Sequence, residues 1–315
     1  MKYVFQSGFA EHINNLLDYR SAMGFSTNWY RRDLAIFDRF CLKNFPGESC
    51  LTKEIAFAWC NDVHSKSGYR VKTIRGFGKY LISSGIDAFI VPSSFLPHRK
   101  ADPPHIFTEN ELRRFFEAAD HFHSCSVSPI IEYTIPTIFR LQYACGLRPQ
   151  EIRLLLRADV NFTDATVYIA KGKHYKERKL AVEFNVMAMC SKYDQIAEII
   201  TPGRTYFFQA PSGGCYSNYW LIDRFQQCWE LSGNGNVRGT CTPYTLRHNY
   251  ATQTLMRWVE EGKDLNAWIP YLSAYMGHNS FSSTFYYIHL LPDRLARMDF
   301  TRTSGIIPEV HYEEE

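Results

Sequence analysis

The chain has 315 residues, 45% of them hydrophobic, so it is long enough to bury one or two substantial cores. Its 35 basic and 32 acidic residues leave a net charge of only +3, which by itself identifies no partner. The charge is uneven, however, with 14 basic against 8 acidic residues in 1–100 and 21 against 24 in 101–315. A basic first third fits an anionic partner, although ordinary solvated surfaces also carry a surplus this small.

Composition and local sequence exclude several classes of protein. Nine scattered cysteines form no C-x-x-C pair, which predicts reduced thiols in a cytoplasmic protein rather than a disulfide framework. The N-terminal residues lack the apolar core of a signal peptide, and no apolar run approaches the ~18 residues of a membrane span. His121, His123 and Cys125 lie close together, but no second ligand cluster accompanies them, so the sequence predicts no metal site.

Residues 3–90 are predicted to form four short helices. Apolar residues recur there at three- and four-residue spacing, and glycine and proline residues separate the segments. The fourth helix, 70–83, carries three cations in an i, i+3, i+7 row that one phosphate backbone could meet: Lys72, Arg75 and Lys79. A solvated helix face is the alternative interpretation of the same row. Four such helices make a compact bundle, which we assign to residues 1–97.

A proline-rich stretch then marks a linker, assigned to residues 98–107. A second domain follows at 108–315, opening with Thr108 as a helix N-cap and Glu111 as its capping-box partner. Two β-prone runs on either side of a polar connection predict a hairpin at 166–182. Further helices are expected at 184–200, 217–231, 243–261, 266–276 and 281–289. The predicted fold is therefore mainly α, with a helical bundle and a mixed α+β domain that contains a small β-hairpin.

Three segments of the second domain place chemically active side chains at constrained positions. In YACGLRPQEIRLLL a glycine ends one helix and a proline starts the next, which holds Arg148 on a short turn. In TPYTLRHNYATQTL, Tyr244 and Arg247 lie three residues apart near a helix N-terminus, where an anion is favoured. In MGHNSFSSTFYYIH, His278 follows a helix stop and Tyr287 comes nine residues later. Since guanidinium groups match the geometry of phosphate, the three segments together suggest phosphodiester chemistry.

Together and in this order, these segments resemble the tyrosine recombinase, or phage integrase, family. The family's first box, G-L-R-x-x-E-[ILV], is matched by GLRPQEI at 146–152. The connection KGKHYKER, 171–178, is similar to the family's lysine turn with one or two extra residues. The second box, H-x-x-R-H in most members, appears as YTLRH at 244–248, and the third lies at 276–287. The motifs cover most of residues 140–290, and the N-terminal helices look like the family's core-binding domain.

The resemblance implies a role for each residue that matches a box. Tyr287 attacks the scissile phosphorus, giving a 3′-phosphotyrosine and a free 5′-hydroxyl. Arg148 and Arg247 bind the non-bridging oxygens, Lys171 protonates the leaving oxygen, and His278 hydrogen-bonds the phosphate. Because the phosphotyrosine keeps the bond energy, neither a cofactor nor a metal is required. The resemblance thus implies a site-specific DNA recombinase that serves a mobile element, or integration and excision.

One position departs from the family pattern, since Tyr244 stands where most members have histidine. A phenol can donate a hydrogen bond to phosphate but is a poor proton shuttle at neutral pH. We expect Tyr244 to act as a donor only. The alternative is that His248 or another group carries the proton.

Two further assignments keep an alternative. Tyr286 adjoins Tyr287, although alignment on the third box selects Tyr287 as the nucleophile. Lys173 lies in the same turn as Lys171 and could replace it. Glu151 is expected to be a structural partner of the first-box arginine rather than a catalyst.

The resemblance also implies partners and an assembly. The implied partner is double-stranded DNA, bound by a homotetramer that holds two duplexes, and accessory recombination proteins are possible further partners. The implied location is the cytoplasm, at the nucleoid, with no membrane contact. The segment LPDRLARMDF, 291–300, is a candidate for the C-terminal helix that family members exchange between protomers, and an acidic tail follows it. No separate arm-site reading domain is expected ahead of the helical bundle.

Two other functions stay open. A type IB topoisomerase uses a similar active site to relax supercoils, but the close spacing of the third box around Tyr287 argues against it. A catalytically silent DNA-binding protein of the same fold is the second, and the competent side chains at all principal positions argue against it.

Overall fold

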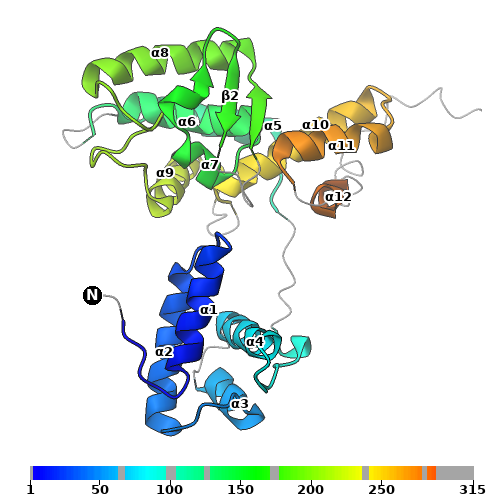
Figure 1. Ribbon diagram of the computed structural model, residues 1–315. Helices are drawn as coiled ribbons and strands as arrows, with labels where there is room; N and C mark the ends of the chain where they lie inside the picture. Colours follow the sequence, from blue (N-terminus) through cyan, green and yellow to red (C-terminus); the bar gives the residue numbers. More distant parts are fainter. Residues whose placement is uncertain are drawn as a thin grey trace, which may run out of the picture. The chain divides into compact units, whose positions relative to one another are not determined.

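The computed structural model describes residues 3–62, 68–96, 104–123, 128–170, 177–235, 241–278 and 282–288 (Figure 1). The chain divides into two compact units, Met1–Ala101 and Asp102–Glu315. This division falls inside the linker predicted at 98–107. As the sequence predicted, the fold is mainly α-helical with one small antiparallel sheet.

In its described part, unit 1 is a bundle of four helices: α1 (Ala10–Ala22), α2 (Asn28–Asn44), α3 (Lys53–Asn61) and α4 (Gly68–Ser83) (Figure 1). A short 3-10 turn, η1 (Ser93–Phe95), follows them. Fully buried aromatic rings fill the core, with centroids 5.4 to 6.1 Å apart in the pairs that Phe9, Phe37, Trp59 and Phe77 form. Tilted and edge-on contacts of this kind add to the stabilisation from burial. The observed helix bounds confirm the four helices predicted for residues 3–90, and the last of them begins two residues before its expected start.

Unit 2 begins with three helices: α5 (Glu109–Asp120), α6 (Ile131–Ala144) and α7 (Pro149–Leu154). The 3-10 turn η2 (Arg157–Asp159) leads into the strands β1 (Val160–Asn161), β2 (Thr166–Ile169) and β3 (Arg178–Ala181). Five more helices follow within the described residues: α8 (Phe184–Ile200), α9 (Asn218–Leu231), α10 (Pro243–Glu260), α11 (Leu265–Met276) and α12 (Ser282–Ile288). The helices expected from residue 184 onward are found with ends within one residue of their predicted bounds, where those ends are described.

Local capping explains why helix boundaries followed from sequence. Thr108 caps α5, and both halves of its capping box with Glu111 are present, with Thr108 N donating to the Glu111 carboxylate over 2.8 Å. Ser217 caps α9 through its side chain alone, its hydroxyl accepting from Trp220 N over 3.0 Å. Such caps satisfy backbone N–H groups that a helix leaves open at its start.

The sheet has the order β1-β2-β3 and is antiparallel throughout. Thr166 pairs with Ala181 and Ile169 with Arg178, which confirms the hairpin predicted at 166–182. Its connection, 171–176, lies outside the described residues. The strand β1 was not predicted, because two residues are too short to show an alternating pattern. The register places Arg178 at the start of β3, beside that connection.

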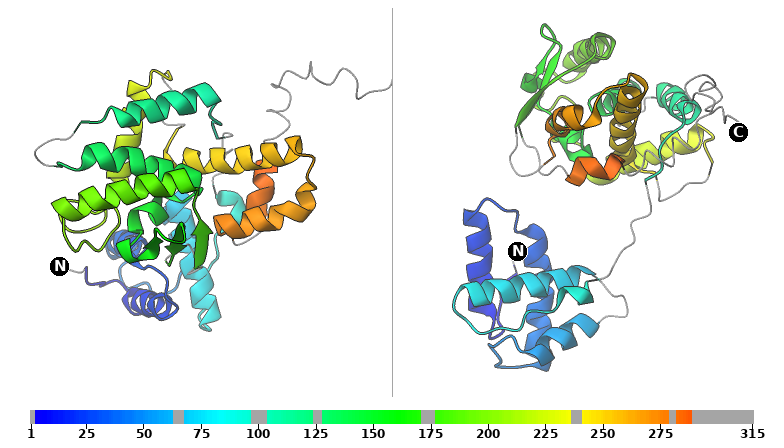
Figure 2. Two further views of the ribbon diagram at one scale, coloured as in Figure 1. Left: turned by 90° about the horizontal axis from the view of Figure 1, so that it is seen from above. Right: turned by 90° about the vertical axis from the view of Figure 1, so that its right-hand side faces the viewer.

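The helices α10, α11 and α12 pack together around a small core of their own, and they gather beside one another in both views of Figure 2. Leu255, Ile269, Leu272, Met276 and the ring of Tyr287 belong to this core. The burial of Tyr287 therefore depends on how these three helices pack. None of the described helices has both the length and the apolar content needed to cross a membrane.

Candidate active site

The turn between α6 and α7 holds Arg148 in one place. Gly146 has φ +57°, in the left-handed region, and a Cβ at this position would lie 2.6 Å from Tyr250 Cδ1. Glycine is required here for both reasons. Arg148 follows as the N-cap of α7, with Pro149 at the first helical position. The sequence predicted this short turn, and the packing of Gly146 against Tyr250 makes it rigid.

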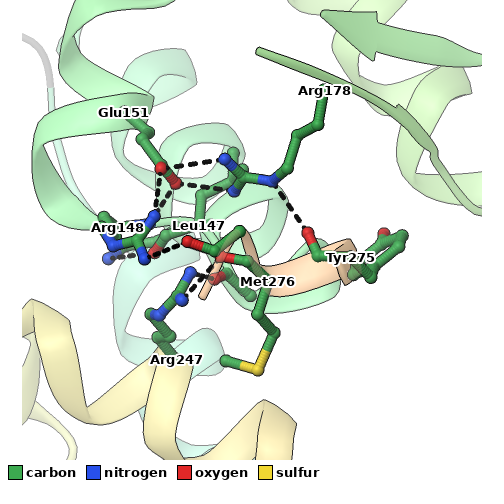
Figure 3. A network of polar contacts seen from close by, with 10 residues as sticks. Leu147, Arg148, Glu151, Arg178, Arg247, Tyr275 and Met276 are labelled. Carbon is green, nitrogen blue, oxygen red and sulfur yellow. Dashed lines mark hydrogen bonds and ion pairs between the residues drawn. The ribbon is translucent and has the colours of Figure 1, made fainter. Parts of the chain in front are cut away.

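Glu151, on α7, binds two arginines at once (Figure 3). Its side chain is 1% exposed, and it accepts from Arg148 Nη1 over 2.7 Å and from the backbone N of Arg148 over 2.9 Å. Arg178 Nη1 and Nη2 donate to its two oxygens over 3.0 and 2.9 Å, a bidentate pair. Burial alone would raise the pKa of Glu151, but the hydrogen bonds and charges of Arg178 and Arg148 outweigh it and lower the pKa to about 2. Glu151 is thus a carboxylate that positions the Arg148 turn, as expected.

Arg178 links this cluster to the end of α11. Its Nε donates to the carbonyl of Tyr275 over 2.8 Å, while the hydroxyl of Tyr275 donates to Ala181 O over 3.0 Å. Gly277 ends α11 with φ +64°, and a Cβ there would lie 2.9 Å from Arg178 Nη1. The sequence pattern included Arg178 in the lysine-turn motif but did not indicate that it is the second partner of Glu151.

Arg247, on α10, is completely buried and links the Gly146 turn to the C-terminal end of α11. Its Nη1 donates to Gly146 O over 2.6 Å and its Nη2 to Met276 O over 2.7 Å (Figure 3). Arg148 makes a parallel link, with Nη2 donating to Gly277 O over 2.7 Å. Burial, followed by the nearby charge of Arg148, lowers the pKa of Arg247 to about 10, so it stays charged at neutral pH. Two guanidinium groups therefore converge on the segment 276–278.

The phenol of Tyr287 lies within the same region. Tyr287 is 3% exposed, and its ring lies against that of His278, with centroids 6.1 Å apart and planes 16° apart. Its hydroxyl is 3.1 Å from Nδ1 of His248. Nδ1 of His278 is 2.7 Å from the hydroxyl of Thr284, which is completely buried. The two histidines thus flank the phenol.

Burial, and after it the charges of the arginines, sets the protonation states of these groups. Burial, then the charge of Arg247, lowers the pKa of His248 to about 4. Burial, then the charges of Arg247, Arg148 and Arg178, lowers that of His278 to about 3. Burial raises the pKa of Tyr287 to about 12, although Arg247 opposes the shift. At pH 7 both imidazoles are neutral and the phenol keeps its proton.

The other residues singled out by sequence lie in different surroundings. Tyr244 is 40% exposed, and its ring centroid is 5.1 Å from that of His248. Tyr286, the alternative nucleophile, is 39% exposed, while Tyr287 is buried. Lys171 and its alternative, Lys173, lie outside the described residues.

The three cations of α4 are not equivalent. Lys72 and Lys79 are exposed, whereas Arg75 is half-buried and its Nη1 donates to the carbonyl of Val91. Arg75 therefore also supports the fold of unit 1, which the i, i+3, i+7 spacing did not indicate.

Within the described ranges, no group of three His, Cys, Asp or Glu side chains is placed to hold a metal ion. His121 Nδ1 instead lies 2.7 Å from the carbonyl of Glu117, and Cys125 is outside those ranges.

Comparison with known proteins identifies the family. Residues 105–294, well over half of the chain, match the phage integrase family. The chain belongs to that family. It is a tyrosine recombinase, and neither the topoisomerase nor the silent DNA-binding alternative is favoured.

Relatives and solved structures resemble this recombinase over most of its length. A putative integrase/recombinase, y4rE, of Sinorhizobium fredii is 25% identical over 91% of this chain and 93% of its own length. The tyrosine recombinase XerC of Oceanobacillus iheyensis is 23% identical over 90% of this chain and 93% of its own. The XerH site-specific recombinase bound to palindromic difH substrate has a TM-score of 0.63 at 16% identity, covering 90% of this chain and 82% of that one. The Tn1549 transposon integrase in complex with transposon right end DNA has a TM-score of 0.64 at 12% identity, covering 93% and 99%. The two structures support the same fold.

Proposed function

We propose that this recombinase cuts and rejoins double-stranded DNA at specific sites, with Tyr287 as the nucleophile. The observation that carries the proposal is the convergence of Arg148, Arg247, His278 and the Tyr287 phenol from three distant segments of unit 2. Attack by Tyr287 Oη on the scissile phosphorus would give a 3′-phosphotyrosine and a free 5′-hydroxyl. The relatives whose structures contain difH or transposon-end DNA support DNA as the substrate.

Arg148 and Arg247 would bind the non-bridging oxygens of the phosphate. Each terminal nitrogen of a guanidinium carries two hydrogens, so a nitrogen that donates to a carbonyl or carboxylate keeps a second hydrogen for phosphate. Their existing bonds to Gly277 O, Gly146 O and Met276 O would fix the two groups before DNA arrives. Charge held in place in this way stabilises the pentavalent transition state without reorganisation.

His278 would donate to the phosphate from Nε2, because Nδ1 faces the Thr284 hydroxyl. A Thr284 hydroxyl that donates to Nδ1 would leave the proton on Nε2, and a neutral imidazole has this tautomer available. Lys171 would protonate the leaving 5′-oxygen, as the family resemblance implies, and Tyr244 would donate a hydrogen bond to the phosphate from its exposed position.

Unit 1 would bind the DNA backbone through α4, with Lys72 and Lys79 as the main contacts and Arg75 as a lesser one. The complete assembly would be a homotetramer on two duplexes at the nucleoid, with segment 291–300 exchanged between protomers. Accessory recombination proteins would select among the outcomes of strand exchange.

A covalent adduct tests the nucleophile. Nicked suicide duplexes drawn from DNA flanking the gene are incubated with wild type, Tyr287→Phe and Tyr286→Phe, and the products are separated on a denaturing gel. We expect an adduct that only Tyr287→Phe abolishes. Loss only in Tyr286→Phe would move the nucleophile by one residue. No adduct, despite specific binding to the same duplex, would contradict the proposed chemistry.

A further inference from the structure

The hydroxyl of Tyr287 has a specific partner that the family resemblance did not assign. Nδ1 of His248 lies 3.1 Å from Tyr287 Oη, across the contact between α10 and α12. Their ring centroids are 5.5 Å apart. Three ångströms is the reach required of a group that takes a proton directly from a hydroxyl.

The two neighbouring candidates for this task are placed differently. Tyr244 precedes His248 by one helical turn, is 40% exposed, and makes no hydrogen bond to Tyr287 within the described part of the chain. His278 lies against the face of the Tyr287 ring, and its Nδ1 is directed to Thr284 instead. Among the described residues, the position that carries histidine in most family members therefore makes no hydrogen bond to the phenol here, while the histidine four residues later does.

We propose that His248 is the general base that receives the proton of Tyr287 during cleavage and returns it during ligation. This step rests on the proposed function of Tyr287. As Oη bonds to phosphorus, the Oη–H bond breaks and an Nδ1–H bond forms, while the bond from phosphorus to the 5′-oxygen breaks and that oxygen takes a proton from another acid. In ligation the 5′-oxygen bonds to phosphorus and its hydroxyl proton returns to the conjugate base of that acid, while the phosphorus–Oη bond breaks and Nδ1–H returns its proton to Oη.

Burial and the neighbouring charges set the protonation state of His248. The groups that face it are Arg247 and Tyr244 on α10 and Tyr286 and Tyr287 on α12. Burial and the charge of Arg247 hold the pKa of His248 at about 4, so the imidazole is neutral and can accept a proton at pH 7. A phosphodiester bound to Arg247 would offset part of that positive charge and make His248 more basic when DNA is in place.

The test compares His248→Asn with wild type on the suicide duplex, in single-turnover cleavage. The Asn amide oxygen can accept a hydrogen bond near the position of Nδ1 but cannot take up a proton. We expect cleavage to slow by about 10²- to 10⁴-fold with unchanged DNA affinity. His123→Asn, the same change at an exposed histidine of unit 2, is the matched control. Thermal unfolding curves show whether the variants fold. If the melting temperature of His248→Asn is well below that of wild type, His248→Gln is tested in its place.

One change in the DNA and one in Tyr287 show whether His248 acts as a general base, as a general acid or only through packing. A duplex with sulfur in place of the 5′-bridging oxygen has a leaving group that needs no proton, so it should not rescue His248→Asn. A trifluorotyrosine at position 287 has a more acidic phenol, so it should reduce the His248→Asn defect to under about tenfold. Cleavage by His248→Asn within about threefold of wild type, or rescue by the sulfur, would overturn the proposal. The proposed function would still stand on the adduct that Tyr287→Phe abolishes.

Discussion

Replacing Glu151 by Gln tests the ion-pair cluster that holds Arg148 and Arg178. The substitution keeps the size of the side chain and removes the charge that Arg148 and Arg178 share. The pKa of Glu151 lies at about 2 instead of the ordinary 4.5. A difference of about 2.5 units corresponds to roughly 3 kcal/mol of unfolding free energy at neutral pH. This agrees with the ~3–5 kcal/mol that breaking a buried ion pair costs.

The effect has a defined dependence on pH. Because the pKa of Glu151 is depressed in the folded protein, its stabilisation is fully present above pH 4.5 and is lost as the pH falls toward 2. The difference in unfolding free energy between wild type and Glu151→Gln should therefore narrow by roughly 1 kcal/mol between pH 7 and pH 4.

Urea unfolding measures this difference, and hydrogen exchange of peptides from α7 and β3 assigns it to unit 2. Glu117→Gln is the control, since Glu117 is 54% exposed in its i, i+4 pair with Arg113 and should change stability by less than about 0.5 kcal/mol. A Glu151→Gln effect below about 1 kcal/mol at pH 7, or one that is the same at pH 4, would refute the reasoning.

Two other predictions follow from the geometry. Gly277→Ala should destabilise the protein by about 1–2 kcal/mol, because φ is +64° and the new Cβ would lie 2.9 Å from Arg178 Nη1. It should also slow cleavage by displacing Arg178, and a melting temperature and cleavage rate equal to those of wild type would contradict this. Replacing both Lys72 and Lys79 by Ala should reduce the slope of log affinity against log salt by about two, as expected for two lost phosphate contacts. An unchanged slope of log affinity against log salt in binding titrations would show that these two lysines of α4 do not contact the DNA backbone.

Local signals in the sequence were sufficient for most of the helices, for the β2–β3 hairpin and for the order of the motifs, but not for the two-residue strand β1. Periodic apolar residues and N-caps act within a few residues, so the helix ends around Thr108 and Ser217 could be predicted. The Gly146 turn that carries Arg148 was predicted for the same reason, since its glycine and proline act through their own backbone geometry.

Contacts between segments far apart in the sequence could be identified only from the tertiary structure. Arg178 meets Glu151 across 27 residues, His248 meets Tyr287 across 39, and Arg148 meets the carbonyl of Gly277 across 129. Such pairs depend on the packing of α7, β3 and α10 to α12, which no periodicity encodes. For the same reason, the sequence placed Tyr244 and Arg247 near one helix N-terminus but did not reveal that one is exposed and the other completely buried. The sequence determined which residues are available for chemistry, and packing decided which of them touch Tyr287, the proposed nucleophile.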